Sequence, residues 1–104
     1  MSGSLRRPLG PTELVTELGR HPGWRLQGDG PDLSIARRYE FGSYPEVMAF
    51  ANAVAWMAQQ RDHHPDLLVS YRHCMVAWRT HDAGGITRLD FECAAQVDAL
   101  RGTA

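Results

Sequence analysis

The apolar positions of this chain follow two different periods, which predict alternating helices and strands. Residues 47–58 carry apolar side chains at i, i+3, i+4, i+7, i+8 and i+11, the spacing of one face of a long α-helix. Residues 33–41 repeat every two positions instead, which is typical of a half-buried strand. A strong turn signal, Gly28-Asp29-Gly30-Pro31, separates this strand from an earlier one that begins at Trp24, so we expect the two to pair as a hairpin.

Capping and breaking residues predict where the two longer helices begin and end. Ser43 and Glu46 have the spacing of a capping box at the start of the long helix. That helix must stop before Pro65, because proline pushes its predecessor out of the α region. Thr87 and Asp90 repeat the capping-box spacing, which predicts the start of a last helix.

Three further elements complete the predicted order. Thr12 is expected to cap a short first helix. Residues 67–71 and 75–80 are interpreted as two more strands, joined tightly around Arg72-His73. The resulting order, α-β-β-α-β-β-α, predicts an α+β fold in which a four-stranded antiparallel sheet carries helices packed on one face.

Length and composition indicate one ordinary globular domain. The chain has 104 residues, of which 43% are apolar and 22% charged, so we expect a disordered tail at residues 1–10 and a single domain at 11–104. A formal charge of −1 argues against binding to nucleic acid, and there is no apolar run of membrane-spanning length. Cys74 and Cys93 lack CxxC spacing, and no secretion signal is recognised, so a cytoplasmic protein with inert buried thiols is expected.

Three of the five histidines, His63, His64 and His81, lie close together in sequence and are the candidate chemical groups. Imidazole titrates nearest neutrality among side chains, so such a cluster suggests proton transfer or metal binding. The end of the long helix and the end of the fourth strand can converge at one edge of the sheet, which would bring the three rings together. The alternative is that His63 and His64 cap the helix and that His81 is a surface loop residue.

Zinc is a competing interpretation, because three histidines with Asp82 or Asp90 offer enough ligands. The spacing is poor for a metal. Chelating pairs usually stand four apart on a helix or two apart on a strand, whereas adjacent side chains such as His63 and His64 tend to point apart. We therefore expect a site without a metal.

The spacing of these residues resembles the signature of the pterin-4a-carbinolamine dehydratases, known in animals as the dimerisation cofactor of a homeodomain transcription factor. The matching run is Gln59-x3-His63-His64-Pro65-x5-Tyr71-x9-His81-x8-Asp90. Gly23-Trp24-x-Leu26 is similar to the first strand of that family, and Thr80-His81-Asp82-x-Gly84-Gly85-x-Thr87 to its active-site loop. The order of helices and strands also agrees with the family fold.

The resemblance implies a hydro-lyase that dehydrates 4a-hydroxytetrahydrobiopterin to the quinonoid dihydropterin and uses no cofactor. One proton must reach the departing 4a-hydroxyl group and another must leave N5, and histidine suits both roles. By position, His63 and His81 would be the proton-transfer pair, and His64 would bind and polarise the hydroxyl group.

Substrate-binding roles are implied by the same resemblance. Trp24 would lie against the flat pterin ring, at the edge of the cleft, or it is an ordinary core tryptophan at the start of a strand. Thr80 belongs to the active-site loop, and Asp62 could hold an imidazole or remain a solvated charge. Asp90 could orient a catalytic histidine, satisfy the helix N-terminus, or do both. Trp78 is expected either to pack under the sheet or to lie exposed at a subunit interface.

One position departs from the family pattern: it is usually acidic or otherwise ionisable, and here it is Gln59. Glutamine can form hydrogen bonds but cannot stabilise an imidazolium as a carboxylate would. The family that the chain resembles also has members that keep the fold and have lost the activity, such as a Rubisco assembly factor associated with carboxysomes. The alternative is therefore a binding or assembly protein without dehydratase activity. In either case a homodimer or homotetramer is expected.

Overall fold

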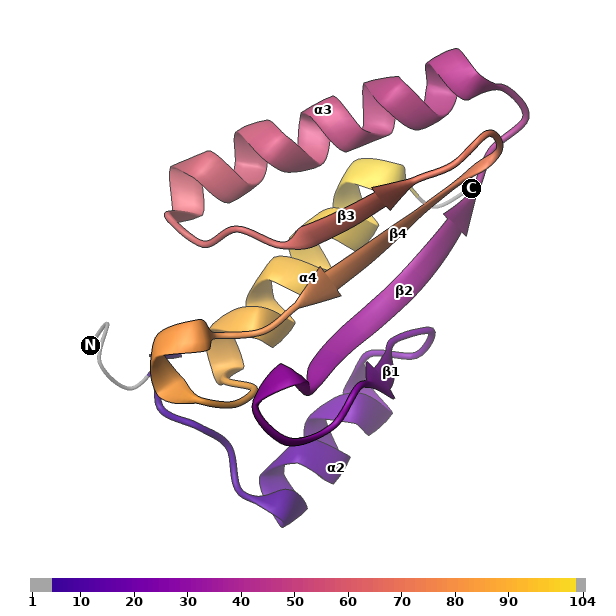
Figure 1. Cartoon of the computed structure of the whole chain (residues 1–104). Coiled ribbons are helices and arrows are strands. Elements are labelled where there is room, and N and C mark those ends of the chain that lie inside the picture. The colour runs from indigo at the N-terminus through magenta and orange to yellow at the C-terminus, as the bar shows by residue number, and fades with distance from the viewer. Residues whose placement is uncertain (1–4, 103–104) are drawn as a thin grey trace.

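The structure, a computed structural model, describes residues 5–102 (Figure 1). It confirms the predicted order of helices and strands. Two single-turn 3₁₀ helices, η1 (Gly30–Asp32) and η2 (His81–Ala83), interrupt the loops. The main elements are α2 (Pro11–Arg20), β1 (Arg25–Gln27), β2 (Ser34–Glu40), α3 (Tyr44–Arg61), β3 (Asp66–Val69), β4 (His73–Trp78) and α4 (Arg88–Arg101).

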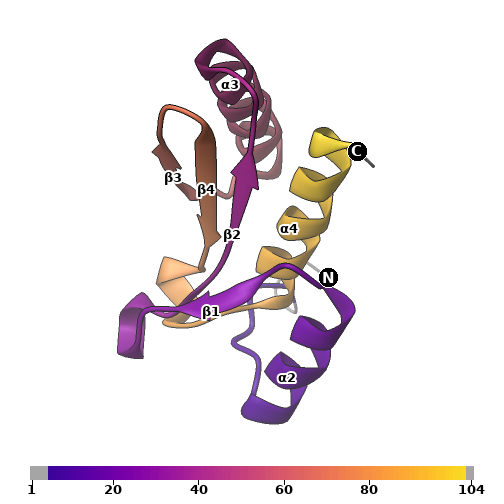
Figure 2. The same ribbon diagram turned by 90° about the vertical axis from the view of Figure 1, so that its right-hand side faces the viewer.

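The four strands form one antiparallel sheet in the order β1-β2-β4-β3. Viewed along the sheet, α3 and α4 lie side by side on one face (Figure 2). Ile35 on β2 pairs with Trp78 on β4, and both side chains are fully buried beneath these helices. Because strand residues alternate between faces, Ala77 points to the opposite, helix-free face. No helix within residues 5–102 has the length and apolarity needed to cross a membrane.

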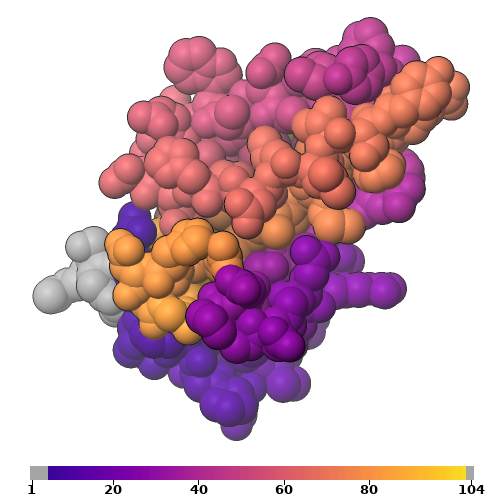
Figure 3. All heavy atoms as spheres, viewed as in Figure 1, coloured from indigo at the N-terminus to yellow at the C-terminus, as the bar shows by residue number. Residues whose placement is uncertain are grey.

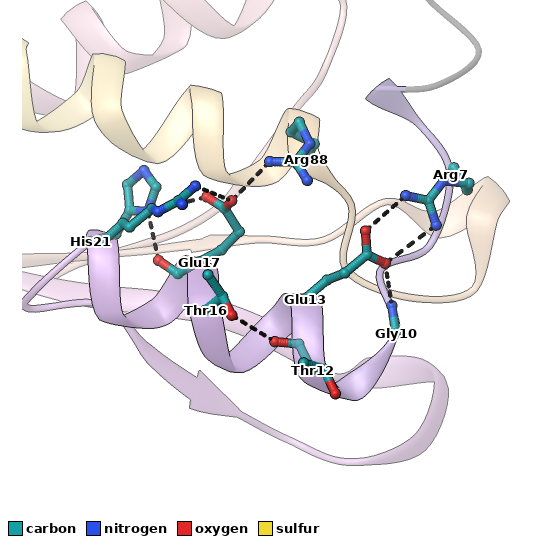
Figure 4. Close-up of polar contacts among 9 residues, drawn as sticks. Arg7, Gly10, Thr12, Glu13, Thr16, Glu17, His21 and Arg88 are labelled. Carbon is teal, nitrogen blue, oxygen red and sulfur yellow. Dashed lines mark hydrogen bonds and ion pairs between the residues drawn. The ribbon is translucent and has the colours of Figure 1, made fainter.

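Helix α2 is attached to the start of α4 by a buried carboxylate (Figure 4). Glu17 is 6% exposed and accepts hydrogen bonds from Arg88 on α4 at 2.8 Å and from Arg20 at 3.3 Å. His21, at the end of α2, packs its ring 5.0 Å from Phe91. A buried charge needs such pairing, so these contacts determine where the first helix docks.

Two sequence-based boundaries are corrected. Gly10, not Thr12, caps α2: Pro11 occupies the first helical position, and the Glu13 carboxylate accepts the Gly10 N–H at 3.1 Å. The second hairpin turns at residues 70–72, and His73 is already in β4, paired with Glu40. The strand begins earlier than predicted because it pairs with β2 as far as Glu40, the last residue of β2, and it ends at Trp78 rather than at residue 80.

The segment before α2 also differs from the expected disordered tail. In its described part, residues 5–10, the Leu9 N–H donates to the Ile86 carbonyl at 2.9 Å and Pro8 bridges to Thr87. Leu5 and Leu9 pack against the core, because this contact removes their apolar side chains from water. Residues 1–4, the rest of the predicted tail, lie outside the described residues.

Two buried acids predict that the fold weakens at alkaline pH. Burial raises the pKa of the Cys93 thiol to about 11. Burial and the hydrogen bond to Asp98 also raise the pKa of the Tyr39 phenol. The unfolded chain would lose these protons first, so this stability is complete below about pH 8.5 and is lost as pH rises towards the folded-state values.

We expect the free energy of unfolding in urea to fall between pH 8.5 and 11, by on the order of 2 kcal/mol from Cys93 alone. Tyr39→Phe should make this fall smaller, because it removes one of the two acids. A free energy of unfolding that stays constant across this range would contradict the burial of Cys93.

Candidate active site

The three candidate histidines line one open cleft of about 230 Å³ at the end of the sheet. Helix α3 supplies two of them through its C-terminal turn. Asp62 adopts a left-handed conformation with φ of 50°, and the His63 N–H donates to the Ala58 carbonyl at 3.1 Å. This turn ends the helix before Pro65 and leaves His63 buried and His64 exposed.

His63 is held from two directions. Its Nε2 lies 2.6 Å from Oδ1 of Asp90, and its ring stacks on the Trp78 indole with the centroids 5.4 Å apart and the planes 18° from parallel. The side chain is buried, at 6% exposure. Trp78 therefore packs under the sheet, the first of its two expected positions, and the imidazole is fixed in orientation by a carboxylate and an aromatic face.

Asp90 orients the histidine and caps a helix at the same time. While Oδ1 faces His63, Oδ2 accepts hydrogen bonds from the Thr87 N–H and the Thr80 hydroxyl, each at 2.9 Å. The carboxylate is completely buried, and such a charge persists only when its oxygens are satisfied. The capping box predicted from the sequence is present, and the same side chain positions the cleft's buried imidazole.

His64 and His81 are exposed and approach the cleft from different elements. Nε2 of His64 lies 3.0 Å from Oε1 of Gln59, one turn back on α3. With the amide oxygen as acceptor, Nε2 carries the proton and Nδ1 is left as an acceptor. His81 was expected to end the fourth strand, but it begins η2, which Gly84 closes in a left-handed conformation with φ of 71°.

Of the other predicted site residues, Asp62 and Thr80 line the cleft, but Trp24 does not. Trp24 is 4% exposed, and its indole N–H donates to the Asp98 carboxylate at 3.1 Å. Asp98 lies roughly 12 Å beyond Asp90 along α4, since each residue adds about 1.5 Å. The expectation that Trp24 lies against a ligand is therefore corrected: the indole lies in the core, where its N–H is hydrogen-bonded to a carboxylate.

Sequence reasoning missed two arginines that line the cleft, Arg6 and Arg79. Arg6 reaches the cleft because its segment packs on the domain, and its Nη2 donates to the Asp62 carbonyl at 3.2 Å. Arg79 follows Trp78, and its Nη1 lies 2.7 Å from the Asp32 carboxylate of η1. The alternation of β4 residues between the two faces of the sheet could have indicated on which face Arg79 lies. The position of Arg79 next to the cleft, however, depends on where the strand ends.

In the described part of the chain, no three His, Cys, Asp or Glu side chains form an arrangement that could hold a metal ion. One nitrogen of His63 already faces Asp90. We predict that protein purified without a chelator contains no stoichiometric zinc by elemental analysis. Stoichiometric zinc that disappears in His63→Ala would contradict the acid–base interpretation of this cleft.

Comparison with known proteins identifies the family of this chain. The family model described as pterin 4 alpha carbinolamine dehydratase matches residues 7–100. A protein of Paracidovorax citrulli with that provisional name is 50% identical over 99 residues, covering 95% of this chain and 85% of the relative. A Chromobacterium violaceum protein with the same provisional name is 44% identical and covers 89% of this chain and 82% of its own length.

Two solved structures share the fold. A transcriptional coactivator/pterin dehydratase from Brucella melitensis has a TM-score of 0.84 and 27% identity, over 92% of this chain and all of that one. A pterin dehydratase-like protein identified as a RuBisCO assembly factor in the alpha-carboxysome has a TM-score of 0.67 and 27% identity, over 81% of this chain and 95% of that one. From its match over residues 7–100 and these close relatives, the chain belongs to the pterin 4 alpha carbinolamine dehydratase family.

Proposed function

We propose that the protein dehydrates 4a-hydroxytetrahydrobiopterin to quinonoid dihydropterin, with the histidine cleft as its active site. One observation carries the proposal: three imidazoles line one cleft, and one of them is paired with a buried carboxylate. Such a set can supply a proton and accept another near neutral pH, which is what the reaction needs. Family membership supports the same substrate class.

The reaction breaks the bond between C4a and its hydroxyl group and forms a double bond between C4a and N5. The hydroxyl oxygen leaves as water after receiving a proton, and N5 loses its proton. We assign the base role to His63, because Asp90 accepts the Nε2–H, leaves Nδ1 to take up the proton and stabilises the resulting imidazolium. His81 would be the acid, and His64 would bind and polarise the hydroxyl group.

The remaining cleft residues would hold the pterin. Asp62 and Thr80 line the cleft, although the Thr80 hydroxyl already donates to Asp90. No cofactor is needed for the proposed step, because no electrons are exchanged. We also propose a homodimer or homotetramer, supported by large apolar side chains left exposed, with Trp56 on α3 at 73% and Leu68 on β3 at 60%.

The neutral Gln59 favours the alternative, a binding or assembly protein like the carboxysomal relative, and it suggests the test. Gln59→Glu would place a carboxylate beside His64, so activity should stay the same or rise. Gln60→Glu, which adds the same charge at the next exposed position, is the control. The assay follows quinonoid dihydropterin formation from freshly generated carbinolamine, with buffer alone as the background.

If the wild-type protein gives no acceleration over buffer and Gln59→Glu does not rescue it, the dehydratase proposal fails. Co-purification with Rubisco large subunit would then test the assembly role directly. Acceleration by the wild-type protein would show that Gln59 is compatible with catalysis.

A further inference from the structure

A further cavity, of about 410 Å³, lies on the helix-free face of the sheet and shares no lining residue with the histidine cleft. Its floor contains Ala36 on β2 and Met75 on β4, each next to a core residue that points to the helices. Arg25 pairs with Ala36, and Arg38 pairs with Met75, so both arginines stand on this face as well. In the space-filling view of the same face, the β1–β2 hairpin, in purple, meets the β3–β4 hairpin, in salmon and orange (Figure 3). The cavity is therefore separate from the proposed active site.

The lining of this cavity is cationic. It contains three arginines, Arg25, Arg37 and Arg38, and no aspartate or glutamate. The whole chain has a formal charge of −1, so this is a local excess of positive charge. A hollow that is lined by one sign of charge concentrates ions of the opposite sign. The lining therefore predicts an anionic ligand.

Two of the three arginines have donors to spare. Arg37 is already paired, since its Nη1 lies 3.1 Å from the Asp98 carboxylate. Arg25 has no ion-pair partner among residues 5–102. Arg38 donates from Nε to the exposed Glu40 at 2.8 Å, which leaves its two terminal nitrogens without a partner in the described part of the chain. Guanidinium groups with free donors bind phosphate and carboxylate oxygens strongly.

The spacing of Arg25 and Arg38 suits a single anion between them. Arg38 lies two residues beyond Ala36, the partner of Arg25, so the two arginines are diagonal neighbours across β1 and β2. Such neighbours are about 7–8 Å apart at Cα, a distance that two long side chains can close around one group. A phosphate monoester, with a charge of about −2, matches the two guanidinium groups better than a single carboxylate does.

The floor indicates that the ligand also has an organic part. Ala36 and Met75 offer apolar surface, and the flexible methionine can adapt to the shape of a ring or an alkyl group. Gln27, at the β1 side, adds an amide that can donate or accept a hydrogen bond. The volume falls in the range of sites for small molecules.

We propose that this cavity is a binding site for a small organic phosphate, held by Arg25 and Arg38 over the floor of Ala36 and Met75. The site does not depend on the proposed function, because no residue of the histidine cleft contributes to it. It gives the protein a second ligand of a different chemical class from a pterin.

Calorimetric titration with phenyl phosphate, phenol and inorganic phosphate tests the two parts of this proposal. We expect the wild-type protein to bind phenyl phosphate at least about 10-fold more tightly than either of the others, because only phenyl phosphate uses both the arginines and the apolar floor. Arg25→Gln and Arg38→Gln should each weaken the binding of phenyl phosphate by about 10-fold, the worth of one charged hydrogen bond. Both side chains are exposed, so the variants should unfold at nearly the wild-type urea concentration.

Arg72→Gln is the matched control, because Arg72 is exposed and lies outside the cavity. Its affinity for phenyl phosphate should equal that of the wild type. A wild-type protein that does not bind phenyl phosphate, or a loss in Arg72→Gln as large as in Arg25→Gln, would overturn the proposal. Equal affinity for inorganic phosphate would also overturn it, since the floor would then contribute nothing. So would tighter binding of a single-stranded oligonucleotide that is lost in Arg25→Gln, because the arginines would then serve a polyanion.

Discussion

His63→Ala should lower the rate of carbinolamine dehydration about 10²–10⁴-fold, the usual worth of a positioned acid or base. The substitution removes the ring that Asp90 and Trp78 hold in place. His81→Ala should cost a similar factor, because it removes the proposed acid. His73→Ala is the matched control, since His73 starts β4 outside the cleft and should keep the wild-type rate.

The two histidine variants should differ in stability, which separates catalysis from folding. His63→Ala leaves the Asp90 carboxylate buried without its imidazole, so its free energy of unfolding should fall. His81 is exposed, so His81→Ala should unfold at nearly the wild-type urea concentration while losing activity. Full activity in a folded His81→Ala protein would remove His81 from the mechanism.

Asp90→Ala should lower the free energy of unfolding by about 3–5 kcal/mol, the usual cost of breaking a buried charged pair by removing one partner. The carboxylate also accepts hydrogen bonds from Thr80 and Thr87, which would be left without that acceptor. Urea denaturation measures the loss. Asp82→Ala removes an exposed carboxylate from the same cleft and should stay within about 0.5 kcal/mol of the wild type.

Asp90→Asn distinguishes the positioning role of Asp90 from its structural one. The amide keeps the size of the side chain and one acceptor oxygen for the helix cap, but it cannot stabilise an imidazolium on His63. Its rate of dehydration should therefore fall by a larger factor than its folding equilibrium constant. If Asp90→Ala unfolds at the wild-type urea concentration, the buried pairing described for this carboxylate is wrong.

The elements that could be predicted from the sequence are those with local causes. The side-chain N-cap at Ser43 and the capping box at Thr87 depend on residues three positions apart, and Pro65 ends a helix by clashing with its neighbour. The convergence of the end of the long helix with the end of the fourth strand followed from the order of elements, although His81 lies in η2 just beyond that strand. Asp90 could be recognised as a candidate in two ways. Its spacing from Thr87 predicts a helix cap, and the family resemblance suggests that it orients a catalytic histidine.

The features that were not predicted depend on long-range contacts. Trp24 lies in the core because its indole meets Asp98, a residue 74 positions away in the chain. Arg6 reaches the cleft only because the segment before α2 packs against Ile86 and Thr87. The second hairpin turns earlier than expected because β4 pairs with β2 as far as its last residue, Glu40, and no pattern within β4 itself indicates where its partner ends.

The most direct test of the account is a stopped-flow comparison of wild-type protein with a His63→Ala/His64→Ala/His81→Ala variant, each against buffer. Circular dichroism would first establish that the triple variant is folded at the assay temperature. We predict that the wild-type protein accelerates quinonoid dihydropterin formation and that the folded triple variant runs at the buffer rate. A folded triple variant that matches the wild-type rate, or a wild-type protein no faster than buffer, would contradict the claim that this cleft dehydrates a pterin.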